Sequence, residues 1–152
     1  MKYWLLKTEP DCYSIDDLKK EKKTPWAGVR NFQARNFMRD DMQVGDMAFI
    51  YHSSTKDKGI YGLAKVASKP YPDKTAFDKG DEHYDAKYDK SDNPTWFLVD
   101  FAFVQKFEKP MLLGELKLDQ KLEGMMVRER GSRLSIQPVS EKHFEYILKR
   151  LA

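Results

Sequence analysis

The sequence has little of what several protein classes require. Its 152 residues include one cysteine, Cys12, which excludes an internal disulfide and a cysteine-based zinc site and is typical of a reducing compartment. Its opening apolar run meets Lys7 and Glu9 almost at once, so it is too short for a signal peptide or a membrane span. These absences predict a cytoplasmic protein that does not enter a membrane.

Signatures of the common catalytic sites are also missing. The sequence has no P-loop, no dinucleotide-binding glycine fingerprint, no His-Glu-x-x-His pair and no Gly-x-Ser-x-Gly elbow. Its three histidines are scattered, and no pair of catalytic carboxylates can be placed together from the sequence. We therefore predict no metal, no cofactor and a binding function rather than an enzymatic one.

The excess of positive charge is small. With 27 Lys and Arg residues against 24 Asp and Glu residues, the net charge is +3, far below that of proteins held to nucleic acid by charge alone. Bulk electrostatics then gives only weak, salt-sensitive attraction to a polyanion. Specificity for a ligand has to come from a pocket.

What the chain does have is enough apolar material for one domain. A chain of 152 residues, 41% of them hydrophobic, can bury a core without disulfides or metals. No repeat or linker divides it, so we expect a single domain over residues 1–152 and a monomer. The twenty aromatic side chains exceed what such a core demands, which leaves some of them to line a surface cleft.

Apolar periodicity predicts five or six strands with short helices between them. Strands are expected over residues 2–8, 47–53, 60–66, 95–107 and 134–138, the second and third of them as a hairpin. Helices are expected after Ser14, over residues 30–42 and after Ser140, with helical turns at 112–118 and 122–127 and a long surface loop over 69–94. Because strands and long helices do not alternate, the pattern favours an α+β fold on a mixed, strongly curved sheet or small barrel.

The most informative segment covers residues 26–37 and reads WAGVRNFQARNF. It interleaves aromatic, guanidinium and amide side chains. Aromatic faces stack on bases, arginine binds phosphate, and amides hydrogen-bond the edges of bases. The segment is therefore compatible with a nucleotide-binding pocket, and an ordinary amphipathic helix packed on a core is the alternative.

Among the histidines, only His52 is expected in a site. It lies at the end of a predicted buried strand, between Tyr51 and Ser53, where it can form hydrogen bonds without catalysis. One alternative to a binding protein is an enzyme acting on a nucleobase, with His52 and an acid from residues 73–92 transferring protons. A module that binds a small molecule or a protein in the same cleft is a third interpretation.

Several blocks of this sequence, in order along the whole chain, resemble the EVE domain family. They are residues 4–10, 26–37, 44–46 with 51–53, 71–73, 83–85, 94–96 and 131–138. The resemblance implies a fold related to the PUA domain, a small mixed β pseudo-barrel with peripheral short helices, and binding of modified bases in DNA or RNA. Ala27 departs from the family pattern, which often has an acidic residue here, so the hydrogen bond of that acid is missing.

The residues and the resemblance together predict a non-catalytic protein that takes an extruded, modified base of DNA or RNA into an aromatic pocket. Trp26 and Trp96 are expected to stack on the base, with a place in the core as the alternative for each. The predicted ligand-binding residues are Trp26, Arg30, Asn31, Tyr51, His52, Ser53 and Trp96. The predicted phosphate-binding residues are Lys7, Arg35 and Arg133, and Arg30 is expected to hold phosphate as well. A structural ion pair is the alternative for Arg133.

Overall fold

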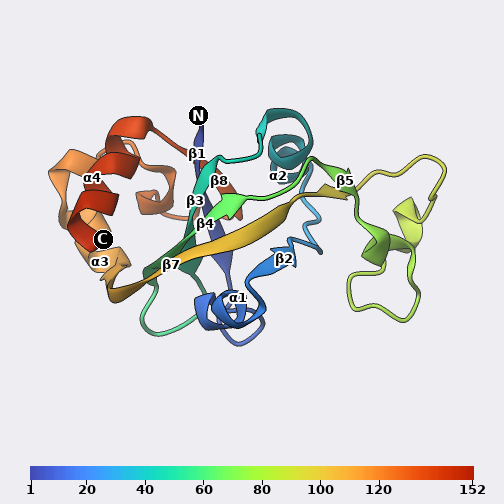
Figure 1. Ribbon diagram of the computed structural model, residues 1–152, viewed down its shortest axis with the longest axis horizontal. Helices are drawn as coiled ribbons and strands as arrows, with labels where there is room; N and C mark the ends of the chain where they lie inside the picture. The colour runs from blue at the N-terminus through green and yellow to red at the C-terminus, as the bar shows by residue number, and fades with distance from the viewer.

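A strongly curved, six-stranded sheet forms the centre of the structure, a computed structural model that describes residues 1–152 (Figure 1). The strand order is β2-β7-β4-β3-β1-β8; β1 and β3 are parallel, and all other neighbours are antiparallel. These strands are β1 (Tyr3–Thr8), β2 (Lys23–Pro25), β3 (Met47–His52), β4 (Gly59–Val66), β7 (Asp100–Leu112) and β8 (Ile136–Val139). Two further strands, β5 (Tyr71–Pro72) and β6 (Phe97–Leu98), pair with each other.

Short helices surround the sheet. Helix α1 (Ile15–Glu21) begins at Ser14, which forms a reciprocal capping box with Asp17. Helix α2 (Phe32–Asn36) continues directly into a π-helical turn, η1 (Phe37–Asp41). The other helices are η2 (Lys74–Phe77), η3 (Ala86–Tyr88), α3 (Leu113–Leu118), η4 (Gln120–Leu122), η5 (Met126–Arg128) and α4 (Glu141–Leu151). None of these helices is both long enough and apolar enough to span a membrane.

Each face of the sheet is covered by its own hydrophobic cluster. In β1, Leu5 belongs to one cluster, whereas Trp4 and Leu6 belong to the other, because successive side chains of a strand point to opposite faces. The first cluster contains residues of α1 and α2 and is called the α1–α2 core; the second contains residues of α3 and α4 and is called the α3–α4 core. Trp26 belongs to the α1–α2 core.

The predicted fold class is confirmed, since short helices surround a curved, mixed β pseudo-barrel sheet. The hairpin of β3 and β4 is also confirmed. The single strand predicted over residues 95–107 is wrong in its bounds: β6 and β7 are separate, and β7 runs on to Leu112 with register shifts against β4. Such shifts bend a strand that would otherwise be too long for a small sheet.

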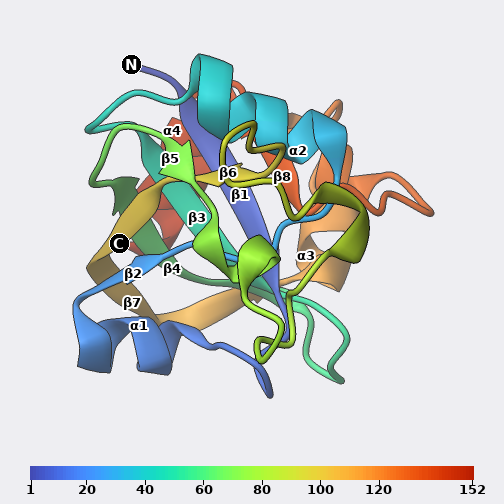
Figure 2. The ribbon, with the colours of Figure 1, turned by 90° about the vertical axis from the view of Figure 1, so that its right-hand side faces the viewer.

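The helix predicted over residues 30–42 starts later than expected. Asn31 has extended backbone angles and caps the helix, so α2 begins at Phe32. The sequence pattern also failed to predict β2, because its three residues show no apolar alternation. Residues 69–94, expected as a long loop, contain β5, η2 and η3 and lie in front of the sheet in Figure 2.

Candidate functional site

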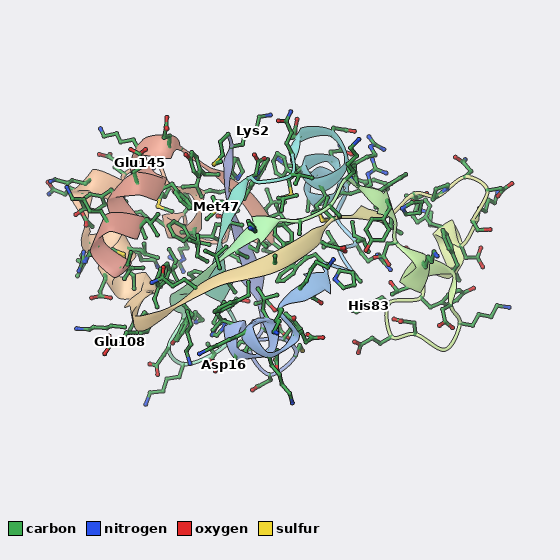
Figure 3. The ribbon with its side chains drawn as sticks, viewed as in Figure 1. Lys2, Asp16, Met47, His83, Glu108 and Glu145 are labelled. Atoms are coloured by element: carbon green, nitrogen blue, oxygen red, sulfur yellow. The ribbon has the colours of Figure 1, made fainter.

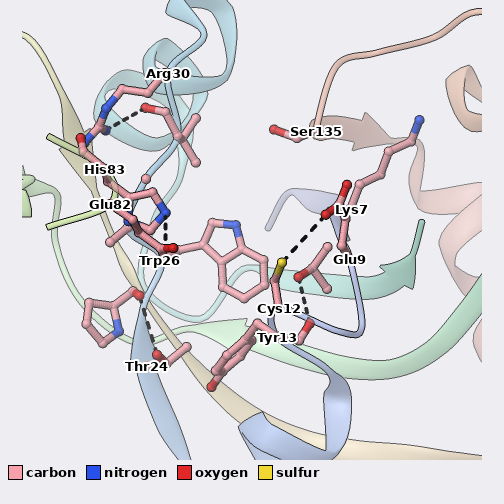
Figure 4. Close-up of a pocket in the computed structure, with 15 residues that line it drawn as sticks. Lys7, Glu9, Cys12, Tyr13, Thr24, Trp26, Arg30, Glu82, His83 and Ser135 are labelled. Atoms are coloured by element: carbon pink, nitrogen blue, oxygen red, sulfur yellow. Dashed lines mark hydrogen bonds and ion pairs between the residues drawn. The ribbon is translucent and has the colours of Figure 1, made fainter. Parts of the chain in front are cut away.

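A pocket of about 520 Å³ lies between the ends of several elements (Figure 4). Its walls come from the end of β1 and the loop after it, from β2 and the chain that follows it, from the loop between η2 and η3, and from the residue before β8. Residues 24–30 supply seven of the 15 residues that line it. This volume is within the range of small-ligand sites, roughly 300–1,000 Å³.

Trp26 forms the main apolar wall. Its ring packs edge-on against Phe101, with 5.5 Å between centroids, and against Tyr13 at 6.0 Å. Although only 9% of Trp26 is exposed, Figure 4 shows its indole nitrogen directed into the open part of the pocket, on the side of Arg30 and Ser135. The indole therefore offers a ligand a fixed aromatic surface and one hydrogen-bond donor.

An ion pair with a buried carboxylate fastens this wall to the loop after β5. Asp73, 1% exposed, accepts hydrogen bonds from the backbone N–H of Gly28 at 2.9 Å and from the Arg30 guanidinium at 3.1 Å. Burial by itself would raise the pKa of Asp73, but hydrogen bonds from Thr75, Gly28 and Arg30 outweigh burial and lower that pKa below its usual range. Asp73 is thus an ionised anchor.

Gly28 allows His83 to form the adjacent wall. Gly28 has φ +85°, and a Cβ atom there would lie 2.5 Å from the His83 ring, so only glycine fits. The imidazole is 38% exposed and lies near Asp81 and Glu82, with nitrogen–oxygen distances of 3.4 and 3.7 Å. Figure 3 shows His83 in the half of the molecule opposite to Glu145 of α4.

The opposite wall carries polar side chains from the end of β1. Lys7 donates from Nζ to the Ser132 carbonyl at 2.9 Å, and burial lowers the pKa of Lys7. The exposed Cys12 thiol hydrogen-bonds Glu9 at 3.7 Å, and partial desolvation together with Glu9 raises the pKa of Cys12, which favours the thiol over the thiolate. No three His, Cys, Asp or Glu side chains are grouped to hold a metal ion.

Of the predicted site residues, the structure brings Lys7, Trp26 and Arg30 to this pocket. The phosphate-holding role predicted for Arg30 disagrees with its contacts, because its guanidinium donates to Asp73, to the Thr75 hydroxyl at 3.1 Å and to the His83 carbonyl at 2.6 Å. Together with a bond to the Val29 carbonyl, these bonds occupy both terminal nitrogens, and the remaining Nε is buried, so no donor is left for a phosphate. Arg30 instead positions the loop that carries His83.

Trp96 lies outside the pocket, contrary to the prediction that it stacks on the ligand there. It is 3% exposed, and its indole nitrogen donates to Asp85 at 2.9 Å. Its ring packs against Phe32 and Tyr88, with the Arg30 guanidinium 5.6 Å from its centroid. Trp96 therefore supports Arg30 and the loop rather than contacting a ligand.

The residues at the end of β3 do not reach the pocket either, which corrects the prediction for Tyr51, His52 and Ser53. His52 is 6% exposed and accepts a hydrogen bond from the Ile15 N–H at 3.1 Å. Burial lowers the pKa of His52 and keeps it neutral. Tyr51 is buried in the α3–α4 core, and the backbone N–H of Ser53 donates to the Thr8 carbonyl.

Three predicted residues lie on the rest of the surface. Asn31 accepts from the Ala34 N–H at 2.9 Å, as the cap of α2. Arg35 donates to Asn36 and to the Thr95 carbonyl, so its predicted phosphate contact disagrees with its bonding. Arg133 is exposed and forms no ion pair, which leaves it available to phosphate.

Sequence reasoning missed Tyr13, Asp73 and His83. Asp73 and His83 fall within blocks that carry the family resemblance, 71–73 and 83–85, and this position was the one feature of the sequence that could have marked them as site residues. No feature of the sequence marked Tyr13. Its hydroxyl is buried without a hydrogen-bond partner, and burial is the main cause that raises the pKa of Tyr13 to about 12.

Comparison with known proteins gives consistent matches over the whole chain. The model of the EVE domain family matches residues 2–150. Thymocyte nuclear protein 1 of Homo sapiens is 42% identical over 165 aligned residues, which cover 96% of this chain and 72% of that protein.

Solved structures match equally well. A hypothetical protein from Leishmania major has a TM-score of 0.93 and 46% identity, over 99% of this chain and 94% of that one. The human THYN1 protein in complex with 5-methylcytosine containing DNA has a TM-score of 0.90 and 40% identity, over 99% of this chain and 97% of that one.

Proposed function

Because this chain belongs to the EVE domain family, we propose that it is a non-catalytic DNA-binding protein that takes an extruded 5-methylcytosine into the pocket beside Trp26. The observation that carries this proposal is the similar human protein, whose structure is a complex with 5-methylcytosine containing DNA. The similarity covers 99% of this chain, which supports the same class of ligand for this protein.

The chemistry of the pocket supports a cytosine. The edge of this base has an amino group that donates hydrogen bonds, and a ring nitrogen and a carbonyl oxygen that accept them. The pocket offers carboxylates of Glu9 and Glu82 as acceptors and the Ser135 hydroxyl as a donor. The Trp26 ring supplies a stacking surface between these groups.

Magnitudes indicate that stacking alone is not sufficient. Extrusion of a base costs a few kcal/mol, and stacking on an aromatic side chain returns about 1–3 kcal/mol. Hydrogen bonds to the base edge and contacts with phosphate must supply the remainder. Arg133 is the predicted phosphate contact that the structure leaves exposed, and Lys7 is a second one at the pocket wall.

The other predictions stand at different levels of support. An enzymatic role depended on His52, and that residue is buried and bonded to the start of α1, which argues against proton transfer to a ligand. Binding of RNA, a monomeric state and a cytoplasmic location stay predictions from the sequence.

Fluorescence anisotropy on labelled duplexes with one 5-methylcytosine or one cytosine at the same position tests the proposal. We expect tighter binding of the methylated duplex, and a loss of about tenfold or more in Trp26→Ala, because the stacking surface is removed. Trp26→Phe keeps an aromatic ring and is expected to lie in between. Leu118→Ala is the control, since Leu118 is 85% exposed on α3, away from the pocket. Equal affinity of the wild type and a folded Trp26→Ala for the methylated duplex would overturn the proposal.

A further inference from the structure

Phe32 is the single exposed side chain among the twenty aromatic residues. It is 49% exposed, whereas the other large aromatics are buried or partly buried. One exposed apolar residue needs no explanation in itself. The surroundings of Phe32 do need one, because three side chains pack against its ring and still leave it half exposed.

The ring of Phe32 is fixed by its neighbours. It lies 4.9 Å from the Trp96 ring at 32°, and 6.0 Å from the Tyr88 ring, edge to face. The Arg35 guanidinium is 4.9 Å from its centroid and is itself held by hydrogen bonds to Asn36 and to the Thr95 carbonyl. The side chain is therefore preorganised, and inserting it into a partner requires little further ordering.

Phe32 also adjoins the proposed base pocket. It follows two residues after Arg30, which lines the pocket, and two residues of extended chain span at most about 7 Å. Arg30 connects the pocket to the Phe32 ring, since the Arg30 guanidinium lies 5.6 Å from the Trp96 ring on which Phe32 packs.

We infer that Phe32 is a wedge that enters the base stack of duplex DNA at the gap left by the extruded base. The inference rests on the proposed function, since only an extruded base leaves such a gap. An aromatic ring in this gap stacks on the flanking bases and so offsets part of the energy that extrusion costs. The partner is thus a duplex, because a single strand has no gap to fill.

Affinities of Phe32→Ala and Trp26→Ala for matched duplex and single-stranded oligonucleotides, each with one 5-methylcytosine, test this inference. We expect Phe32→Ala to weaken duplex binding by about tenfold and single-strand binding by less than twofold. Trp26→Ala is expected to weaken both. Phe32→Leu, which keeps an apolar wedge, should recover most of the duplex affinity, and thermal melting verifies that each variant is folded.

A base analogue gives a second readout. 2-Aminopurine beside the methylated cytosine is quenched when stacked, so wild-type protein should change its fluorescence and Phe32→Ala should change it less. Unaltered duplex affinity and fluorescence in Phe32→Ala, with binding lost in Trp26→Ala, would overturn the wedge and leave the pocket intact. Equal losses on duplex and single strand in Phe32→Ala would also overturn it. A Trp26→Ala variant that binds normally would instead reject the pocket itself.

Discussion

The α3–α4 core and the pocket region are held together by different kinds of contact. In the α3–α4 core, Phe49 stacks on Phe144 at 4.3 Å and meets Phe107 at 6.2 Å, and all three rings are at most 2% exposed. In the pocket region, the ionised Asp73 joins Gly28 and Arg30 through hydrogen bonds. Apolar contacts thus fill the α3–α4 core, whereas a network of hydrogen bonds supports the walls of the pocket.

Buried polar atoms without partners reveal the same difference. Three such side-chain atoms occur in the structure, and two of them, the Tyr13 hydroxyl and the Arg30 Nε, belong to residues that line the pocket. Native proteins leave few such atoms unsatisfied. The unpaired polar atoms around the pocket therefore lower the stability of the fold, whereas the packed rings of the α3–α4 core raise it.

The largest expected effect comes from removing a ring of the α3–α4 core. Phe144→Ala should lower the free energy of unfolding by about 3–5 kcal/mol, because a buried aromatic leaves a cavity. Urea denaturation measures this loss. Affinity of the folded fraction for methylated duplex should change less than twofold at low temperature. A marked loss of affinity there would show that the two regions are not separable.

Breaking the polar network should have a smaller effect on stability and a larger one on binding. Asp73→Asn removes the charge that pairs with Arg30, and we expect a loss of about 2 kcal/mol in unfolding free energy. DNA affinity should fall about tenfold or more, since the loop carrying His83 loses its anchor. Asp78→Asn is a matched control, because Asp78 is an exposed carboxylate of the same loop. Similar affinities for both variants would contradict the anchoring role.

The dependence of stability on pH tests the assignment of His52 to the protein interior rather than to the pocket. The pKa of His52 is lowered by burial, so below about pH 6.5 the unfolded chain binds a proton that the folded chain does not. Stability should be full above that pH and should fall as the pH drops toward the lowered folded pKa. Thermal melts of the wild type and His52→Gln at pH 7.5 and 5.5 measure it. A wild type with no more pH dependence than the variant would argue against a neutral, buried His52.

The smallest effect is expected for an exposed cation. Arg133→Ala should change the unfolding free energy by less than about 0.5 kcal/mol. If Arg133 contacts one phosphate, the slope of log Kd against log salt should decrease by about 1. Lys117→Ala, exposed on α3, is the control and should leave the slope unchanged. An unaltered slope in Arg133→Ala would remove this residue from the DNA interface.

Local patterns were sufficient to predict much of the fold. Apolar runs located β1, β3 and β4, and Ser14 and Ser140 correctly marked the starts of α1 and α4. The ends of elements were harder. Asn31 caps α2 instead of lying within it. The length of β7 depends on shifts in its pairing with β4 that bend the strand, and such shifts are set by the partner strand and not by the sequence of β7 alone.

The site was predicted only in part because its contacts are remote in sequence. The aromatic and cationic residues of the 26–37 segment pointed to Trp26, which does line the pocket. The partner of Arg30, however, is 43 residues away in Asp73, and that of His52 is 37 residues away at Ile15. Periodicity reports which face a side chain occupies, not which distant group satisfies it. For that reason Arg30 and His52 were assigned to a ligand rather than to the protein.

Fluorine NMR on protein labelled with 5-fluorotryptophan tests the central claim most directly, because the chain has three tryptophans and gives three resonances. Single Trp→Phe variants assign them. Titration with a duplex containing 5-methylcytosine should move the Trp26 resonance most and leave that of Trp4, buried against Asp46, unchanged. Saturation of the protein with DNA while the Trp26 resonance stays in place would contradict the proposal that the base lies against this ring.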